Sequence, residues 1–483
     1  MLFNSIDFAI FLPIVFILYW FVVDKNLKLQ NLLIVVASYV FYGWWDWRFL
    51  SLILFSTLVD YSMGVLLKDE EDKRKRKLFL SISILVNLGL LGFFKYYNFF
   101  LDNFITVFTF LGHPIKAQGL NIVLPVGISF YTFQTLSYTI DVYKRKLEPT
   151  KDLIAFMAFV SFFPQLVAGP IERATNLLPQ FYKKRTFEYD KAVNGLKQIL
   201  WGLFKKTVIA DNAAQIANDI FNNSVDYSGS TLVLGALFFA FQIYGDFSGY
   251  SDIAIGTSRL FGFNLMRNFN FPYFSRDIAE FWRRWHISLS TWFRDYLYIP
   301  LGGSRGGIGM KIRNIFIIFI VSGFWHGANW TFIVWGMLNA LYYMPLLLLG
   351  KNRANTNTVA EGKYIPSIKE FFQMTLTFVL TVLAWIFFRA ENIGHALSYL
   401  STIFSKSLLS MPYFNKMGKG LMTIILILIF MIIEWLGRDK QFAIEEIGMR
   451  WNRITRWFFY AIIIFLIGFY MQTTETPFIY FQF

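Results

Sequence analysis

Two histidines, His286 and His326, lie in residues 281–330, a stretch that also holds arginines, a Gly-rich turn and several tryptophans. His326 stands in Gly-Phe-Trp-His-Gly-Ala-Asn-Trp, within an otherwise apolar run. A histidine at membrane depth is costly and usually faces a bundle interior or a cavity. The alternative is a structural ring bonded to a neighbouring carbonyl. Because the small residues around His326 would let a ligand approach, we favour a chemical role for it over the structural one.

The neighbours of His326 are candidates for positioning the reacting groups. Asn329 could donate a hydrogen bond to an oxyanion, and Trp325 could orient a substrate. No nucleophile stands beside them. The chain has no cysteine, which excludes thiolate catalysis, and it has no G-x-S-x-G motif of a hydrolase. Two distant histidines without a paired carboxylate do not match zinc spacing, so we expect no metal.

Three arginines, Arg283, Arg284 and Arg294, flank His286. On a helix, Arg283 and His286 would share a face, because they are three residues apart. Guanidinium groups suit phosphate, so the arginines are candidates for binding an anionic donor such as coenzyme A or a phosphopantetheine-loaded carrier. The alternative is an interfacial helix whose arginines contact lipid phosphates. The Gly-rich turn at residues 302–307 lacks the ending of a P-loop, so a phosphate role and a flexible connection stay equally open.

The rest of the chain predicts an all-α polytopic membrane protein, which we treat as one domain over residues 1–483. The hydrophobic fraction is 56% and the mean hydropathy is +0.47, and apolar runs approach the roughly 20 residues that span a bilayer. The net charge of +14 sits in short segments between these runs, which indicates the positive-inside rule rather than nucleic-acid binding. The expected apolar runs are 6–23, 31–45, 50–67, 78–99, 121–143, 195–210, 232–250, 312–330, 331–349, 371–388, 421–435 and 457–471.

Counting crossings gives about 11 membrane segments, including re-entrant ones. Residues 5–23 are expected to be a retained helix rather than a signal peptide. Both termini are expected outside, because basic loops follow residues 23, 67, 143, 349 and 436. Residues 101–120 are expected outside the membrane. The short run 153–166 ends in a proline- and glycine-containing segment, which predicts a re-entrant element. Lys205 and Lys206 interrupt the run 195–210, and a polar patch with Asp246 and Asp252 ends the run 232–250.

The chain resembles the membrane-bound O-acyltransferase (MBOAT) family over essentially its whole length. The resemblance rests on WRRWHISLSTWFRDYLYIPLGG, SGFWHGANW, YGDFSGYSDIAIG, LPVGISFYTFQ and FFPQLVAGPIER. It is closest to the bacterial alginate and polysaccharide O-acetyltransferase membrane subunits. The resemblance implies a ring of tilted helices around a central funnel, with donor entering from the cytoplasm and acceptor from the other side. It also implies that His326 is the catalytic histidine and that His286 is a second active-site position, which is Asn in some branches.

The C-terminal segment, residues 473–483, adds a candidate nucleophile. It contains Phe478-x-Tyr480-x-x-Phe483, which resembles the tail of the teichoic acid D-alanylation pathway in which a tyrosine receives the acyl group. An aromatic anchor at the membrane interface is the alternative. The resemblance implies that His326 removes the proton of Tyr480 while this phenol attacks a thioester, since a phenol is a weak nucleophile at neutral pH.

Together these features predict an O-acyltransferase of the bacterial cytoplasmic (inner) membrane, with no bound cofactor and with acetyl-CoA as donor. The acyl group would pass, through an extracytoplasmic partner protein, to a hydroxyl of an envelope polysaccharide. The expected partners are thus the thioester donor, this partner protein, the polysaccharide and membrane lipid. One alternative is D-alanyl transfer from a carrier protein to teichoic acid. An alternative of another class is a non-catalytic transporter.

Overall fold

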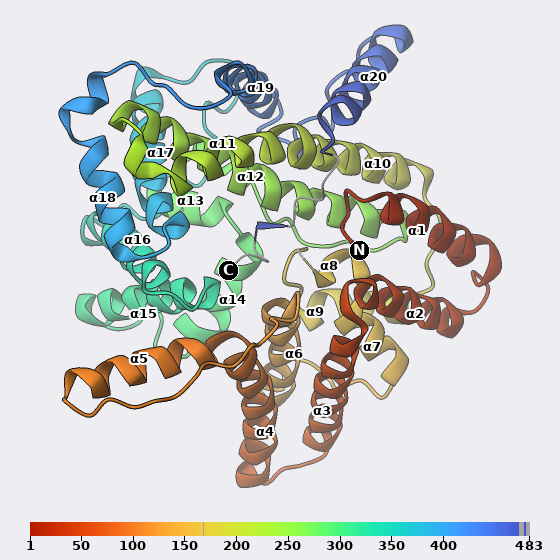
Figure 1. The fold of residues 1–483 in the computed structure, drawn as a ribbon. Helices are drawn as coiled ribbons and strands as arrows, with labels where there is room; N and C mark the ends of the chain where they lie inside the picture. The colour runs from red at the N-terminus through yellow and green to blue at the C-terminus, as the bar shows by residue number, and fades with distance from the viewer. Residues whose placement is uncertain (168, 473–477, 480–483) are drawn as a thin grey trace. The chain divides into compact units, whose positions relative to one another are not determined.

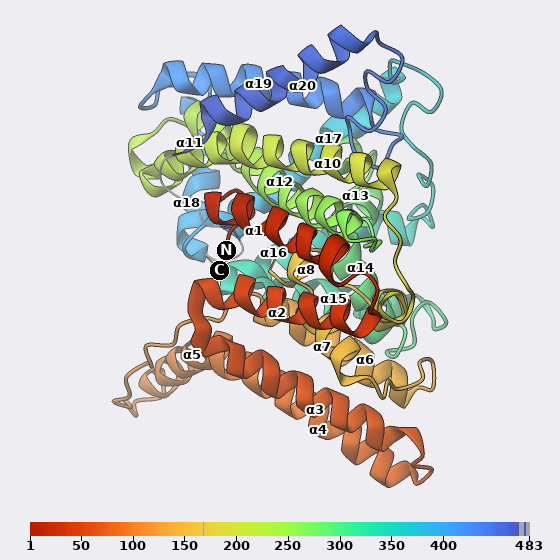
Figure 2. The same cartoon turned by 90° about the vertical axis from the view of Figure 1, so that its right-hand side faces the viewer.

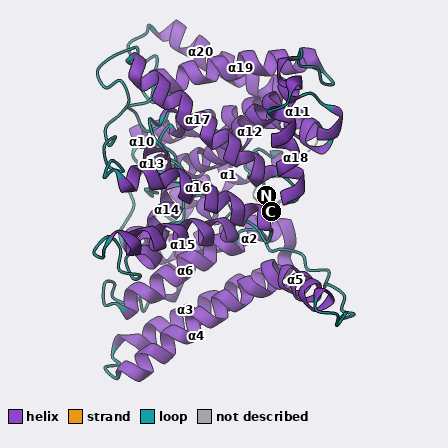
Figure 3. Cartoon of the chain, turned by 90° about the vertical axis from the view of Figure 1, so that its left-hand side faces the viewer, coloured by secondary structure: helices purple, strands orange, loops and turns teal. Residues whose placement is uncertain are grey.

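The computed structural model describes residues 1–167, 169–472 and 478–479. All regular structure in these residues is helical, and none of them forms a strand (Figure 3). The chain divides into two compact units, of which the first comprises Met1–Tyr189 with Ser258–Leu265 and the second comprises Asp190–Thr257 with Met266–Phe483. The expectation of one domain stays a prediction, and each unit is described by itself.

The first unit is built from apolar helices that pack in pairs. Helix α3 packs against α4 and α6, and α2 packs against α7. A short turn at Trp47–Phe49 joins α2 to α3, which leave it in different directions (Figure 1). The helices are α1 (Ile6–Ile17), α2 (Leu27–Asp46), α3 (Leu50–Lys68), α4 (Lys73–Leu91), α5 (Tyr97–Phe110), α6 (Ile128–Tyr143), α7 (Leu153–Ser161), α8 (Phe163–Leu166) and α9 (Ala174–Leu177).

A buried carboxylate joins three of these helices. Asp60 on α3 is fully buried and accepts hydrogen bonds from Asn87 Nδ2 on α4 (2.8 Å), from Ser83 Oγ on α4, and from Thr139 Oγ1 on α6 (3.0 Å). A buried polar group is tolerated when its partners satisfy it. This cluster therefore accounts for a charged residue type inside an apolar run without requiring a role in chemistry.

The structure bears on three expectations from the sequence for the first unit. Of residues 101–120, expected outside the membrane, 101–110 belong to α5, which follows α4 after a π-helical turn at Gly92–Tyr96; their location relative to the membrane stays a prediction. The run 121–143 is helical only from Ile128, because Gly127 adopts a left-handed conformation (φ 75°). The run 153–166 is broken at Phe162, which is non-helical, and a new short helix, Phe163–Leu166, follows with Pro164 in its first turn; the re-entrant element stays a prediction.

The second unit contains the longest helices. Its helices are α10 (Tyr189–Leu203) with a π-helical continuation (Phe204–Ala210), α11 (Asp211–Asn222), α12 (Gly229–Leu260), α13 (Ile278–Arg284), α14 (Ile287–Phe293), α15 (Ile308–His326), α16 (Trp330–Leu348), α17 (Ile368–Arg389), α18 (Ile393–Ile403), α19 (Met417–Leu436) and α20 (Arg453–Tyr470). The polar patch predicted to end the run 232–250 instead lies inside α12, which continues as a helix beyond it.

Glycines bring α10 and α12 into close contact, and the two helices run side by side (Figure 2). A Cβ atom on Gly202 would lie 2.6 Å from the carbonyl oxygen of Gly249, and one on Gly256 would lie 2.5 Å from that of Gly195. Only glycine fits at such crossings, as is common between membrane helices. The close approach holds the π-helical turn after α10 against the middle of α12.

Helix length and hydropathy show an integral membrane protein. Eight helical segments in the described residues are long and apolar enough to cross a bilayer, and two further apolar helices, Ile6–Val22 and Leu153–Leu166, are shorter. One of the eight, Leu27–Lys68, contains both α2 and α3. The polytopic all-α class is thus confirmed, while the predicted ring of about 11 segments around a funnel stays a prediction.

Candidate active site

His326 is the last residue of α15 and is buried among aromatic rings. Its ring centroid lies 5.0 Å from that of Trp325, 5.1 Å from that of Trp335 and 5.2 Å from that of Phe388. Such edge-to-face packing fixes the orientation of the imidazole. The ring is therefore held rigidly at the end of a helix, as a positioned general base requires.

The small residues near His326 serve helix packing, which corrects the expectation that they make room for a ligand. A Cβ atom on Gly323 would lie 2.2 Å from the carbonyl oxygen of Phe332, and one on Gly327 would lie 2.1 Å from the ring of Phe332. These glycines let α16 pack tightly on α15. They affect His326 indirectly, because they allow the close packing of α16 on α15, the helix that ends at His326.

His286 lies in the turn between α13 and α14 and is also buried. It adopts a left-handed conformation (φ 44°, ψ 54°), which is uncommon for a residue with a side chain. Asn268 holds the turn, since its carbonyl oxygen accepts from Ile287 N (2.9 Å) and its Oδ1 from Ser288 Oγ (2.9 Å). Ser288 Oγ lies 3.5 Å from His286 Nδ1. Because α13 ends at Arg284, the prediction that Arg283 and His286 share a helix face is wrong.

Burial lowers the pKa of His286 to about 3, so this imidazole is neutral at pH 7. Unfolding restores a pKa near 6.5, so the unfolded chain binds more protons below that pH. Stability is therefore lost as pH falls from about 6.5 towards 3. We expect this site to lower the unfolding free energy by about 2–3 kcal/mol at pH 4.5 relative to pH 7.5. Thermal unfolding in detergent at several pH values measures the loss.

The control is His286→Asn, which removes the titrating ring. This variant should lose less stability than the parent protein between pH 7.5 and pH 4.5. Equal losses in the two proteins would contradict the assignment to His286.

Trp325 brings the two histidines into one cluster. Its ring centroid lies 6.1 Å from that of His286 and 5.0 Å from that of His326. Phe247 on α12 continues the cluster, with its ring 4.6 Å from that of His286. The two histidines predicted from the sequence therefore pack on one indole, with Trp325 in a position to orient both.

The C-terminal segment meets the same cluster. Phe478 is fully buried, and its ring lies 5.6 Å from that of Phe247 and 4.7 Å from that of Tyr250, both on α12. The backbone N–H of Ile479 donates to Asp246 Oδ2 (2.7 Å). Phe247 thus contacts both His286 and the tail. The predicted nucleophile, Tyr480, lies outside the described residues.

Two buried ion pairs lie between the π-helical turn and α12. Lys206 Nζ lies 2.8 Å from Asp246 Oδ1 and 2.8 Å from Asp211 Oδ1, and Lys205 Nζ lies 2.5 Å from Asp252 Oδ2. The wider π turn lets two consecutive lysines both face α12. Buried charges persist only when they are paired, and each of these lysines lies against at least one of the aspartates.

The arginines proposed for donor binding are engaged within the protein. Arg283 donates to the carbonyl oxygens of residues 352 and 355 (2.8 and 2.7 Å), and Arg284 pairs with Glu280 (2.8 Å). Arg294 is exposed and pairs with Asp295 (2.7 Å). These contacts favour a structural role for Arg283 and Arg284. Donor binding stays a prediction, and Arg283 and Arg294 are the exposed members of the three.

Asn329 caps α16. Its Oδ1 accepts from Thr331 N (3.0 Å), and its Nδ2 donates to the carbonyl oxygen of Glu391 (2.8 Å). Both ends of the amide are therefore used to hold the start of α16 beside the end of α17. This arrangement favours a structural role, and the oxyanion role stays a prediction.

Comparisons with known proteins give the family. The sequence model described as "MBOAT, membrane-bound O-acyltransferase family" matches residues 39–388. This match covers well over half of the chain. The chain belongs to the membrane-bound O-acyltransferase family. It is therefore an acyltransferase rather than the non-catalytic transporter considered above.

The chain is similar to several bacterial proteins that are named as acyltransferases. The chain is 40% identical to the "probable alginate O-acetylase" of Pseudomonas aeruginosa, over 90% of this chain and 81% of that protein. It is 33% identical to the peptidoglycan O-acetyltransferase of Helicobacter pylori, over 100% and 98%. It is 30% identical to the teichoic acid D-alanyltransferase of Bacillus subtilis over 49% of this chain and 62% of that protein.

Sequence reasoning on this MBOAT chain missed the partners of the buried charges. Lys206 and Asp246 were both noted as polar interruptions of apolar runs. The rule that opposite charges at membrane depth pair indicates that these residues have partners, but it does not say which ones. The docking of Phe478 and Ile479 on α12 had no sequence signal beyond the aromatic character of the tail.

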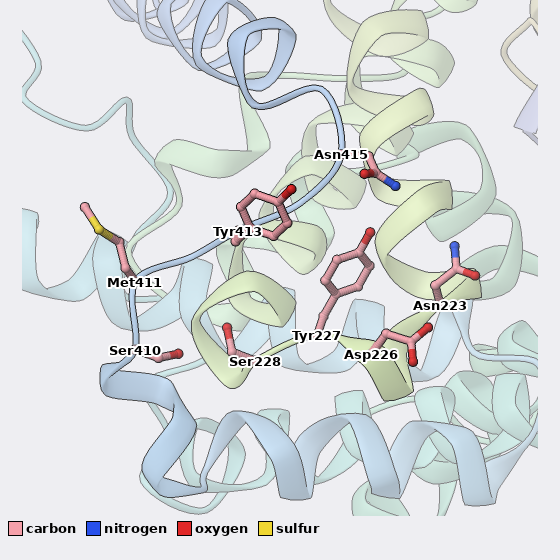
Figure 4. A pocket seen from close by; sticks show the side chains of 8 residues that line it. All are labelled: Asn223, Asp226, Tyr227, Ser228, Ser410, Met411, Tyr413 and Asn415. Carbon is pink, nitrogen blue, oxygen red and sulfur yellow. The ribbon is translucent and has the colours of Figure 1, made fainter.

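A polar groove with a cavity volume of about 580 Å³ opens in the second unit of this MBOAT protein. It is lined by residues 223–228, before α12, and residues 410–415, before α19 (Figure 4). Tyr227 and Tyr413 supply aromatic rings, and Asn223, Asp226 and Asn415 supply amide and carboxyl groups. Such a mixture of rings and hydrogen-bonding groups suits a polar ligand with many hydroxyl groups.

Proposed function

We propose that this chain moves an acetyl group from acetyl-CoA, through an ester on Tyr480, toward a hydroxyl of an envelope polysaccharide. The observation that carries the proposal is the docking of the tail: Phe478 packs on Phe247, which in turn packs on His286. The names of the O-acetylating relatives support acetyl as the acyl group and a polysaccharide as the final acceptor.

The first half-reaction forms the tyrosyl ester. The phenol oxygen of Tyr480 attacks the thioester carbonyl while His326 accepts the phenol proton. The carbon–sulfur bond breaks, and the leaving thiolate takes the proton from His326. The products are acetyl-Tyr480 and free thiol. Burial of both histidines among aromatic rings supports the scheme, since a dry site limits hydrolysis of the thioester and of the ester.

The second half-reaction passes the acetyl group to a sugar. A hydroxyl of the polysaccharide attacks the ester carbonyl, the tyrosyl oxygen leaves, and the phenol is restored. In our proposal an extracytoplasmic partner protein carries out this transfer. The proposal places no bound cofactor in the chain, because the thioester supplies the activated acyl group.

Charge in the loops of the second unit supports the orientation. Loops 349–367 and 437–452, at one end of α16, α17, α19 and α20, each contain three Lys or Arg residues. The segment 390–416, at the other end, contains α18 and only two Lys or Arg residues. The positive-inside rule makes the first end cytoplasmic in a bacterial cytoplasmic membrane. The tail after Tyr470 is then extracytoplasmic. By the count of crossings, the N-terminus is extracytoplasmic as well.

The polar groove lies at the proposed extracytoplasmic end of the second unit. Its two segments are joined there, since Tyr413 N donates to Thr231 Oγ1 at the start of α12 (3.0 Å). We expect Tyr413→Ala to reduce acetyl transfer to the acceptor several-fold, because a largely exposed ring of this kind can pack on a sugar. Formation of acetyl-Tyr480 should stay unchanged. If parent and variant transferred acetyl groups to the acceptor equally well, the groove would not be part of the acceptor-binding site.

Mass spectrometry of the C-terminal peptide after incubation with acetyl-CoA tests the whole proposal. We expect an acetyl group on Tyr480 that disappears when the partner protein and the acceptor are added. The second candidate, D-alanyl transfer, is favoured by the D-alanyltransferase relative and the form of the tail. It would give a D-alanyl ester instead, formed only from a loaded carrier protein. An unmodified peptide with both donors would contradict the tyrosyl ester.

A further inference from the structure

We propose that the buried Lys206–Asp246 pair is a docking site for the chain's own C-terminal segment and sets the register of that segment against α12. The inference rests on the proposed function, in which residue 480 must be delivered to the histidine cluster. Asp246 and Lys206 are then positioning residues, since they act on the reaction through the tail.

The two oxygens of Asp246 serve different partners. Oδ1 lies 2.8 Å from Lys206 Nζ, and Oδ2 accepts from the backbone N–H of Ile479 at 2.7 Å. Lys206 also pairs with Asp211 at 2.8 Å, so the lysine is held from both sides. A hydrogen bond to a charged acceptor is stronger than one between neutral groups. The pair therefore offers a fixed, charged acceptor to one particular amide of the tail.

An aromatic contact completes the docking site. Phe478 packs between Phe247 and Tyr250, which are three residues apart and so lie on one face of α12. Lys206 Nζ lies 5.5 Å above the ring of Tyr250, which ties this ring to the ion pair. The Phe478 ring supplies buried apolar area, while the Ile479 amide selects the register. A slip by one residue would lose both contacts.

The chain provides a matched control beside this site. Lys205 and Asp252 form a second buried pair on the same two elements, and Gln198 Nε2 also donates to Asp252 (2.8 Å). The amide of Ile479 donates to Asp246 and not to Asp252. Removing Asp252 takes away the ion-pair partner that Lys205 has among the described residues, whereas removing Asp246 leaves Lys206 with Asp211. General damage to the fold should thus be at least as large for Asp252→Ala as for Asp246→Ala.

A single introduced thiol reports the docking of the tail. The chain contains no cysteine, and the Ile479 side chain is 2% exposed. In full-length protein carrying Ile479→Cys, in lipid nanodiscs, we expect slow reaction with a maleimide. Adding Asp246→Ala should raise the rate about tenfold or more, the loss expected for one charged hydrogen bond. Adding Asp252→Ala should leave it near the starting rate. Asp246→Asn, which keeps an acceptor oxygen, should give an intermediate rate.

Two results would overturn the proposal. One is an equal labelling rate with and without Asp246→Ala. The other is an equal rise with Asp252→Ala, which would indicate general loosening. Labelling needs no acyl donor, so it separates this inference from the proposed function. If the labelling rate rises with Asp246→Ala but Tyr480 is never acetylated, the docking site is supported and the proposed tyrosyl ester is contradicted. If Tyr480 is acetylated but the labelling rate does not change with Asp246→Ala, the tyrosyl ester is supported and the docking site is contradicted.

Discussion

His326→Ala is expected to abolish formation of acetyl-Tyr480 and of acetylated product, with a loss of roughly 10²- to 10⁴-fold, the usual contribution of a general base. The phenol has a pKa near 10 and is a poor nucleophile at neutral pH unless a base removes its proton. His326 is the residue that α15 and its aromatic neighbours hold rigidly at the cluster. Acetylation of the tail peptide and of the polymer, measured by mass spectrometry, checks the result.

His395→Ala is the matched control for this variant. His395 is a half-buried histidine of the same unit, bonded to Ser224 Oγ (3.1 Å), and has no role in the proposed reaction. The control should keep its activity. Because alanine leaves a cavity beside Trp335 and Phe388, both variants are compared at equal amounts of folded protein, judged by size-exclusion chromatography. Undiminished acetylation in His326→Ala would show that His326 is not the base.

Tyr480→Phe is expected to remove acyl transfer completely while leaving the protein folded. The change deletes one oxygen atom, the nucleophile of the proposed relay, and leaves the docking contacts of Phe478 and Ile479 in place. The thermal midpoint should therefore match that of the parent protein, and donor should be consumed no faster than by background hydrolysis. Mass spectrometry and a thiol-release assay measure the two effects.

Tyr470→Phe makes the same change ten residues earlier, at the end of α20, and serves as the control. It should retain full transfer. If Tyr480→Phe were also fully active, the tyrosyl ester would be wrong and the tail would be only an anchor at the membrane interface.

Much of the fold follows from local sequence, because hydropathy and helix-breaking residues act over short distances. The expected runs 331–349, 371–388, 421–435 and 457–471 correspond closely to α16, α17, α19 and α20. Helices α11 and α18 were missed, because they are amphipathic and lack a long apolar run. The continuity of α12 through its polar patch was missed for a related reason: its charges are neutralised by a distant segment.

The sequence by itself determined the class of protein, the family and the two histidines, because these depend on residue types and on motifs that are local. Tertiary structure decided what each polar side chain contacts. Arg284 faces Glu280, Asn329 caps α16, and Asp246 joins Lys206 to the tail. Hydropathy indicates that a buried charge needs a partner, but not which one. The partner of Asp246 is some forty residues away and that of Ile479 is more than two hundred, so only the packed helices bring them together.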